Sequence, residues 1–271
     1  MQQRHVNRNQ YFSEQIYTTK VHVIPYIEQS MDITGDTTVL EIGCGEGGNL
    51  SPFLDRGCRV YGVDLNQGKI EKAIHFFADH DEAFKATFIC EDIYQLSTDE
   101  LPAVDLIIMR DVIEHIPDQQ RFLGFVKRFL KPTGKIFFGF PPWQMPFGGH
   151  QQTCEHKVLA HLPWFHLLPE SMYKLILRAF GEPDKKLESL LEIRDTRISI
   201  ERFRNILRNE GYRVDQETLW LFNPNYEVKF NLSPKKQHPL IAGIPWLRNF
   251  FTTCCYCLVS MPDVKRDGLA A

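Results

Sequence analysis

A glycine-rich loop near residue 45 has a residue spacing suited to ligand binding. Residues 39–48 read VLEIGCGEGG, so that Gly43, Gly45 and Gly48 form a G-x-G-x-x-G pattern. Glycine has no side chain, which lets the backbone approach a ligand closely. The pattern fits the pyrophosphate of a nicotinamide dinucleotide, and it fits equally well a cofactor that has no phosphate. The glycines alone therefore leave the ligand open.

Carboxylates around this loop favour a positively charged ligand. Glu41 precedes the loop, Glu46 lies within it, and Asp64 and Asp92 follow the next two expected strands. No lysine or arginine falls between residues 41 and 53 to offset these charges. Like charges brought together in a partly desolvated site cost several kcal/mol, which disfavours a pyrophosphate. The sulfonium and ammonium groups of S-adenosylmethionine suit such a site better.

Five histidines between residues 115 and 166 supply candidate proton acceptors. A general base is needed when an acceptor group arrives protonated, and histidine titrates near neutral pH. His115 follows the fourth expected strand and His150 follows the fifth, so these two are the predicted catalytic residues. Each has a structural alternative: a hydrogen bond that fixes the loop for His115, and a solvent-facing position for His150. The other three, His156, His161 and His166, are spaced by five, share no helix face and are not expected to bind a metal.

The composition of the chain is that of an ordinary globular protein. Its 271 residues are 43% hydrophobic and 24% charged, with a formal net charge of −3, so a nucleic acid partner is not expected. Residues 1–10 do not read as a secretory signal, and no apolar run is long enough to insert stably in a membrane. Seven cysteines in a chain of this size favour reduced thiols and a cytoplasmic location. Cys254, Cys255 and Cys257 lack a matching second pair, so a buried strand is expected there and no metal.

Short apolar runs alternate with segments of helical periodicity, which is typical of a parallel sheet flanked by helices. Strands are expected at residues 38–42, 59–64, 86–90, 104–109, 135–140, 212–221 and 253–261. Helices are expected at residues 48–56, 67–78, 119–130, 171–180, 186–191 and 199–208. Ligands bind such a sheet beyond the carboxyl ends of its strands. The glycine loop and the carboxylates are therefore expected at one edge of the sheet.

Prolines and glycines interrupt the alternation after residue 140 and predict an inserted segment over residues 141–197. The apolar residues 162–169 are expected to fasten this insertion to the sheet, with an acceptor pocket as the alternative. Residues 240–251 are expected to cover a sheet edge, with lipid contact as the alternative, although they lack a basic face. Tyr17, on an expected N-terminal helix, is assigned to the core, with a lid over the cofactor as the alternative. Residues 263–271 are expected to form a loose tail.

Several further motifs follow one another at characteristic spacings. They are EIGCG at 41–45, Asp64, ED at 91–92, RDVIEHI at 110–116 and LKPTG at 130–134. In this order the chain resembles the class I S-adenosylmethionine-dependent methyltransferases over residues 36–140, and the last helix and strands also fit. The resemblance implies a doubly wound, Rossmann-like α/β fold with a helical insertion. Its seven-stranded, mostly parallel sheet would have the order 3-2-1-4-5-7-6, with the last strand antiparallel.

The resemblance also implies which residues hold S-adenosylmethionine. The implied cofactor-binding set is Glu41, Gly43, Cys44, Gly45, Asp64, Leu65, Asp92, Ile93 and Arg110. In this set Gly43 and Gly45 pack against the methionine part of the cofactor. The carboxylate of Asp64 holds the ribose hydroxyls, and Asp92 and Ile93 meet the adenine. Glu41 acts through water or on the ammonium group, and Arg110 lines the methionine side through its backbone.

Together these observations predict one methyltransferase domain over residues 1–271. Its expected parts are a helical cover (1–35), a cofactor-binding core (36–140), a substrate-side insertion (141–197) and a C-terminal helix with two strands (198–262). A small-molecule acceptor is expected, with an intermediate of a glycan or lipid pathway as the candidate, and with S-adenosylhomocysteine as the second product. The alternatives are a protein or RNA methyltransferase, a catalytically silent scaffold with this fold, and a nicotinamide-dependent reductase. The methylated atom and the oligomeric state stay open.

Overall fold

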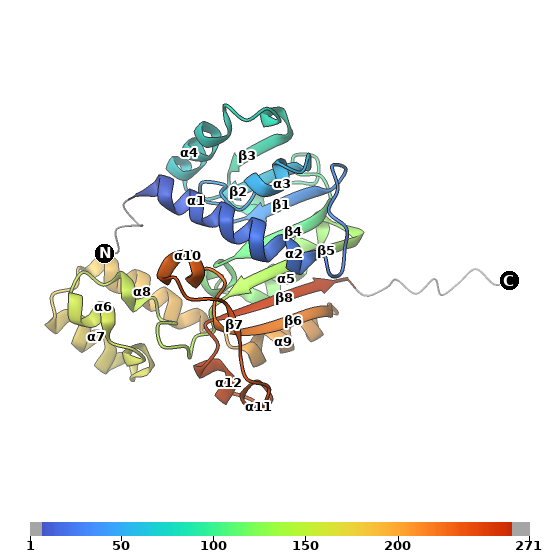
Figure 1. The fold of residues 1–271 in the computed structure, drawn as a ribbon. Coiled ribbons are helices and arrows are strands. Elements are labelled where there is room, and N and C mark those ends of the chain that lie inside the picture. Colours follow the sequence, from blue (N-terminus) through green and yellow to red (C-terminus); the bar gives the residue numbers. More distant parts are fainter. Residues whose placement is uncertain (1–6, 262–271) are drawn as a thin grey trace.

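The computed structural model describes residues 7–261, which form an eight-stranded sheet with helices on both faces (Figure 1). The strands are β1 (Thr38–Ile42), β2 (Arg59–Asp64), β3 (Ala86–Cys90), β4 (Val104–Arg110), β5 (Leu130–Phe140), β6 (Arg213–Phe222), β7 (Lys235–Lys236) and β8 (Cys254–Ser260). Their spatial order is β3-β2-β1-β4-β5-β8-β6-β7. The first five are parallel, and β8 runs antiparallel to both of its neighbours.

This topology confirms the expected order of the sheet, because β6 and β8 are the sixth and seventh strands of the sequence analysis. The difference is the additional edge strand β7, which makes eight strands where seven were predicted. β7 contains only two exposed lysines paired with β6. Two lysines show neither an alternation of apolar and polar residues nor an apolar run, and these are the patterns that predict a strand from sequence.

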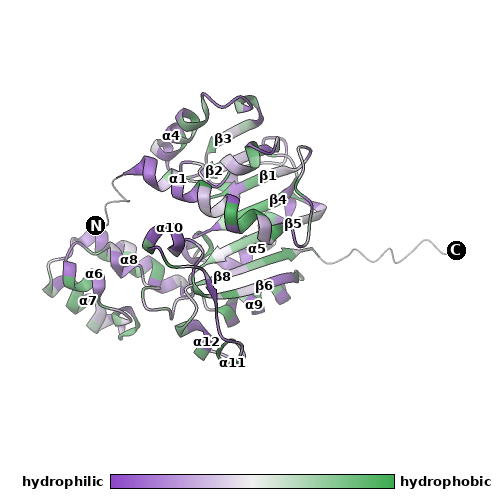
Figure 2. Ribbon diagram, in the orientation of Figure 1, coloured by the Kyte–Doolittle hydropathy of each residue, from purple (hydrophilic) through white to green (hydrophobic). Residues whose placement is uncertain are grey.

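Two hydrophobic layers hold the helices to the sheet. On one face lie α1 (Arg8–Thr18), α2 (Ile24–Ile27), α3 (Ser51–Leu54) and α4 (Gln67–Phe77), and on the other lie α5 (Gln119–Val126) and α9 (Ile200–Asn209). The strands between them are largely apolar, as Figure 2 shows in green. Burial on both faces explains the unbroken apolar character of the central strand β4.

Two predicted boundaries around the sheet were wrong. The helix expected at residues 48–56 is reduced to the four residues of α3, because residues 48–50 and 55–57 form turns. The fifth strand starts at Leu130, five residues earlier than expected. α5 ends at Val126 and is followed by a 3₁₀ turn, and the register of β5 against β4 shifts near Val104, which accommodates the proline and glycine of this segment.

The inserted segment forms a lobe with its own small core. It contains α6 (Lys157–His161), α7 (Glu170–Ala179) and α8 (Asp184–Thr196), which lie together beside the sheet in Figure 1. Within residues 162–169, Phe165 packs against Tyr173 with ring centroids 5.0 Å apart. The buried His166 contacts the backbone oxygen of Trp143 through Nε2 at 2.8 Å. This apolar segment therefore has a structural role, inside the insertion and at its junction with β5.

The C-terminal connector is more exposed than expected. α10 (Tyr226–Phe230), α11 (Pro239–Ala242) and α12 (Leu247–Phe250) lead from β6 to β8. Within residues 240–251, Leu240 and Trp246 are 75% and 61% exposed, while Asn249 is buried and bonded to α9. Trp246 N–H and the Arg248 guanidinium also contact Glu201 of α9. The connector is thus fastened to the start of α9, but it does not bury most of its apolar side chains.

Two other expectations concern the end of the chain and its cysteines. The seven cysteines all carry free thiols, and the three of β8 are buried, as predicted. Among residues 7–261, no helix is long and apolar enough to cross a membrane. The tail expected at residues 263–271 lies outside the described residues.

Candidate functional site

A cavity of about 590 Å³ opens at the carboxyl ends of β1, β2, β3 and β4. The strand order reverses between β1 and β4, and this is where sheets of this kind bind ligands. Six predicted site residues line the cavity: Gly43, Asp64, Leu65, Asp92, Ile93 and His115. The other predicted residues, Glu41, Cys44, Gly45, Arg110 and His150, are not among its lining residues.

The glycine loop is held against the cavity by Asp64. One carboxylate oxygen of Asp64 accepts a hydrogen bond from the backbone N–H of Gly45 at 2.9 Å, and the other accepts one from Asn66 N–H at 2.9 Å. Gly43 and Gly45 have φ values of +73° and +56°, which favour glycine. A Cβ on Gly43 would lie 2.6 Å from a methyl carbon of Val112. The loop therefore needs glycine both for its conformation and for the approach of the β4 loop.

The loop after β3 forms the opposite wall of the cavity. The Asp92 carboxylate accepts a hydrogen bond from the backbone N–H of Tyr94 at 3.0 Å, which fixes its orientation at the start of a short 3₁₀ turn. Ile93 is buried, and Tyr94 and Phe122 contribute aromatic rings with centroids 6.0 Å apart. This wall combines an acceptor carboxylate with flat apolar surfaces, a combination that suits a heteroaromatic ring.

A buried polar network lies behind the glycine loop. The Asn49 side chain donates to Glu41 Oε1 at 2.5 Å, and its oxygen accepts from Arg110 Nη1 at 2.6 Å and from Thr19 Oγ1 at 3.0 Å. Thr19 starts a π-helical turn, Thr19–Val23, between α1 and α2. The network thus joins three segments far apart in the sequence, and it explains why Glu41 and Arg110 lie outside the cavity lining.

The charge of the site is less negative than the prediction from Glu41, Glu46, Asp64 and Asp92. Arg8 of α1 pairs with Glu46 at 2.6 Å, and Lys69 Nζ lies 3.8 Å from Asp64. Burial raises the pKa of Glu41 to about 8, although the hydrogen bond from Asn49 lowers it. Three of the four carboxylates used in the prediction, Glu46, Asp64 and Glu41, are therefore paired with a cation or protonated. The cavity still carries an excess of acidic side chains, with Asp64, Glu91, Asp92, Asp111 and Asp118 against Lys69 and Arg121.

The raised pKa of Glu41 predicts a pH dependence of stability. As the pH rises above about 4.5, the unfolded chain releases this proton while the folded protein keeps it up to about pH 8. The free energy of unfolding must fall across this range, by on the order of a few kcal/mol. Glu41→Gln, which keeps the acceptor for Asn49, is expected to gain stability relative to the wild type between pH 5 and pH 9. Urea unfolding of both proteins at several pH values measures this difference, and a Gln variant that is equally destabilised at every pH would contradict it.

The N-terminal helix places Tyr11 at the site. Burial and the negative charge of Asp111 raise the pKa of Tyr11 to about 12, and the Arg8 guanidinium lies 5.0 Å from its ring centroid. Tyr17, which was assigned to the core, is 39% exposed, so that assignment was wrong. Arg8, Tyr11 and Gln15 follow helical spacing along the face of α1 that packs on the glycine loop, and this spacing was the signal available in the sequence.

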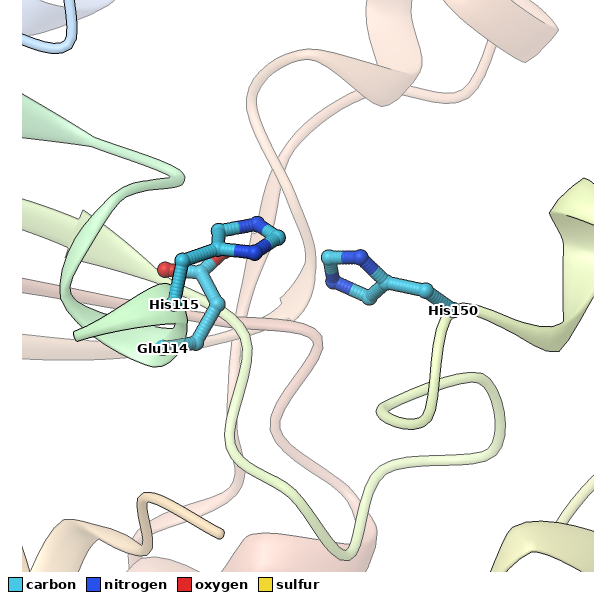
Figure 3. A group of neighbouring side chains, drawn as sticks. All are labelled: Glu114, His115 and His150. Carbon is cyan, nitrogen blue, oxygen red and sulfur yellow. The ribbon is translucent and has the colours of Figure 1, made fainter. Parts of the chain in front are cut away.

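His115 and His150 lie side by side although 35 residues separate them in the sequence (Figure 3). Their ring centroids are 5.1 Å apart and the ring planes are inclined by 67°, and Figure 3 shows the two rings directed at one another, with Glu114 beside His115. Burial, followed by the charge of the other histidine, lowers the pKa of His115 to about 4. Burial and His166 lower the pKa of His150 to about 4. Both imidazoles are therefore neutral at pH 7, with free lone pairs as possible ligands or proton acceptors.

Comparison with known proteins identifies related sequences for the cofactor-binding half. The family model described as "Methyltransferase domain" matches residues 40–138. The ubiquinone biosynthesis O-methyltransferase of Coxiella burnetii is 34% identical over 116 residues, which are 42% of this chain and 47% of that protein. The phosphoethanolamine N-methyltransferase 2 of Caenorhabditis elegans is 30% identical over 112 residues, 41% of this chain and 25% of that one. The aligned region thus spans at most about half the length of these curated relatives.

Solved structures share the fold over nearly the whole chain. The magnesium protoporphyrin IX methyltransferase of Synechocystis PCC 6803, crystallised with S-adenosylhomocysteine, gives a TM-score of 0.54 at 14% identity, covering 92% of this chain and 84% of that one. A Haloferax volcanii methyltransferase bound to its activator gives 0.52 at 16% identity, covering 94% of both chains. The sequence match and the shared fold agree with the motifs and the strand order. Residues 40–138 thus match the methyltransferase domain model, and the chain shares the fold of these solved methyltransferases.

Proposed function

We propose that this chain is a cytoplasmic enzyme that binds S-adenosylmethionine and transfers its methyl group to a small-molecule acceptor, releasing S-adenosylhomocysteine. The observation that supports this most strongly is the acidic cavity at the β1/β4 reversal point, with Asp64 at the end of β2 and the glycine loop opposite. Such a cavity suits a ligand with a sulfonium and an ammonium group better than it suits a pyrophosphate.

Each wall of the cavity matches one part of this cofactor. Asp64 would hold the ribose hydroxyls, and Asp92 with Ile93 would meet the adenine. Gly43 and Gly45 would lie against the methionine part, where no side chain obstructs the ligand. Glu41 and Arg110 would act from behind the loop through the network described above, since neither lines the cavity.

Methyl transfer does not require a covalent bond between the protein and either reactant. The acceptor atom attacks the methyl carbon while the C–S bond opposite breaks, and the positive sulfonium becomes a neutral thioether. Charge is dispersed in this transition state, so alignment of the reactants and exclusion of water supply most of the rate. The chain's own contribution is therefore a rigid cofactor cavity and a second site that presents the acceptor in line.

A second cavity of about 670 Å³ lies between the insertion and α10 and is the proposed acceptor site. Its lining combines apolar and aromatic side chains with polar and charged ones: Met145, Phe147, Cys154, Ala160, Tyr226, Phe230 and Leu232, with Gln152, Glu155, Lys157, His161 and Lys229. Lys229 also lies close enough to act electrostatically on Asp111 of the cofactor cavity, so the two cavities are neighbours. Enclosed space of this size fits a small acceptor with an apolar body.

His115 and His150 are the proposed catalytic residues on the acceptor side. His115 lines the cofactor cavity, and the loop that carries His150 includes Phe147 of the acceptor cavity. The pair therefore lies where the methyl group and the acceptor would meet. The named relatives methylate oxygen and nitrogen, so their names do not fix the acceptor atom.

Calorimetry on the wild-type protein tests the proposed function. We expect S-adenosylmethionine and S-adenosylhomocysteine to bind with Kd values in the micromolar range, which corresponds to about −8 kcal/mol, and NADH not to bind. A competition titration, in which NADH is added to protein already saturated with S-adenosylhomocysteine, tests whether NADH can displace S-adenosylhomocysteine from its site. Tight binding of NADH, or binding of neither sulfur compound, would contradict the proposal.

A further inference from the structure

Glu114, His115 and His150 form a compact cluster beside the cofactor cavity, which His115 lines. One ring nitrogen of each histidine and one carboxylate oxygen of Glu114 lie within 4.8 Å of one another. Glu114 and His115 belong to the 3₁₀ turn Ile113–His115 after β4, and His150 lies on the loop after β5 (Figure 3). Parallel neighbouring strands therefore bring the three side chains together from two loops.

Glu114 is the unusual member of this cluster. It is 3% exposed, and neither of its carboxylate oxygens is hydrogen-bonded to another described residue. A buried carboxylate without a partner is costly, and proteins normally pair such a group with a cation or neutralise it. The groups nearest to this carboxylate are the imidazoles of His115 and His150, and each of them has a nitrogen lone pair that can bind a metal ion. A positive ion placed between them would satisfy all three side chains at once.

We propose that Glu114, His115 and His150 bind one divalent transition-metal ion. Two imidazoles and one carboxylate are ligands that zinc, manganese, iron and cobalt accept, whereas calcium and magnesium prefer oxygen ligands alone. Bonds of about 2.1 Å to one ion place neighbouring ligand atoms roughly 3 to 4 Å apart. Side-chain rotations that close the present spacing by about 1 Å would complete the three-ligand set and leave further positions open.

The loop around His150 is built to hold this side chain in place. His150 has a φ of +56°, a conformation that is rare outside glycine and is kept only where the surroundings enforce it. Its backbone oxygen accepts hydrogen bonds from Thr153 N at 3.0 Å and Thr153 Oγ1 at 2.8 Å. A Cβ on the preceding Gly149 would lie 2.4 Å from His166 Cβ. Close packing on one side and two hydrogen bonds on the other thus fix the backbone that aims His150 at His115.

This inference rests on the proposed methyltransferase function and specifies its acceptor as a small molecule with a hydroxyl group. Bound to the ion, the hydroxyl would have a lowered pKa and would release its proton to water. The oxygen then forms a bond to the methyl carbon, the C–S bond breaks, and its electron pair stays on sulfur as the thioether. The products are the methyl ether or ester, S-adenosylhomocysteine and one proton, with the metal ion unchanged.

Metal titration of the whole chain tests the proposal without knowledge of the acceptor. Protein freed of metal by a chelator is titrated with Co²⁺, followed by visible absorption, and with Zn²⁺, followed by calorimetry. We expect one equivalent to bind per chain. His150→Ala should weaken binding by more than about 100-fold and the isosteric Glu114→Gln by at least about 10-fold. His75→Ala, which removes an exposed histidine of α4 that lines neither cavity, is the matched control and should bind as the wild type does.

Binding of S-adenosylhomocysteine, measured on the same samples, separates the two proposals and shows that each variant is folded. Absence of stoichiometric metal binding in protein that binds S-adenosylhomocysteine would overturn the metal site and leave the proposed function standing. Unchanged metal affinity in His150→Ala, or a thiolate-to-cobalt charge-transfer band, would also overturn it, because the ion would then be held elsewhere. Metal binding without S-adenosylhomocysteine binding would instead contradict the proposed function.

Discussion

Replacing Asp64 with asparagine is expected to weaken the binding of S-adenosylhomocysteine by about 10- to 100-fold, because hydrogen bonds to a charged group are worth about 1.5 to 3 kcal/mol. Both oxygens of Asp64 already accept backbone hydrogen bonds that hold the glycine loop. Asparagine has the same shape but only one acceptor oxygen. It therefore loses the charge offered to the ribose diol and also one contact that orients the loop. Calorimetry with S-adenosylhomocysteine measures the change.

The control for this variant is Glu91→Gln, which neutralises another carboxylate at the same cavity. Glu91 is exposed, and its contact is with the backbone N–H of Asp92, which glutamine can keep. We expect a change of less than about threefold in this control, because screening by water weakens the effect of an exposed charge. Equal losses in the two variants would mean that the general negative field and not the contact with Asp64 determines affinity.

The second large effect is expected at Gly43. Gly43 and Gly45 both have positive φ, so alanine carries a backbone penalty of about 1 to 2 kcal/mol at either position. At Gly43 the new methyl group would also lie 2.6 Å from the Val112 side chain, whereas at Gly45 the nearest neighbour of such a group is Lys69 Cδ at 4.0 Å. Overpacking of this kind costs about 1 to 3 kcal/mol more. Gly43→Ala should therefore be the less stable variant in urea unfolding.

Gly43→Ala should also bind the cofactor more weakly than Gly45→Ala. Val112 lines the cofactor cavity, so a methyl group that displaces Val112 would change the shape of that cavity. We expect Gly43→Ala to lose most of its affinity for S-adenosylhomocysteine and Gly45→Ala to keep a measurable part of it. Equal stability and equal affinity in the two alanine variants would show that the approach of the β4 loop to Gly43 has no energetic importance.

The central part of the fold could be predicted from the sequence because its strands are short apolar runs bounded by turn residues. The boundaries of β1, β2 and β3 agree with those expected, and the antiparallel position of β8 followed from the resemblance. The misses have physical causes. β7 consists of two polar residues that form a strand only through pairing with β6, and α3 is short because turns occupy residues 48–50 and 55–57 on either side of it.

The site could be predicted only where its residues lie at strand ends. Asp64, Asp92 and the glycines follow strands directly, so topology alone brings them together. The ion pair that compensates the charge of Glu46 could not be predicted from strand ends, because its partner Arg8 lies 38 residues away in the sequence. The pairing of His115 with His150 was missed for the same reason: each residue was a candidate by itself, but their contact depends on the path of the loop after β5.

The second cavity and the exposed connector depend even more on tertiary structure. The acceptor cavity combines residues of the insertion with α10, two segments more than 60 residues apart that carry no common motif. The apolar side chains of residues 240–251 were assigned to a covered edge, since hydrophobic residues are usually buried. Their exposure could be seen only once the sheet and its last helices were placed.

A crystal structure of the protein grown with S-adenosylhomocysteine and NADH at equal concentrations tests the central claim most directly. The account predicts S-adenosylhomocysteine in the β1/β4 cavity, with its ribose hydroxyls on the Asp64 carboxylate and its adenine between Asp92 and Ile93. A dinucleotide in that cavity, with its pyrophosphate on the backbone N–H groups of the glycine loop, would contradict it.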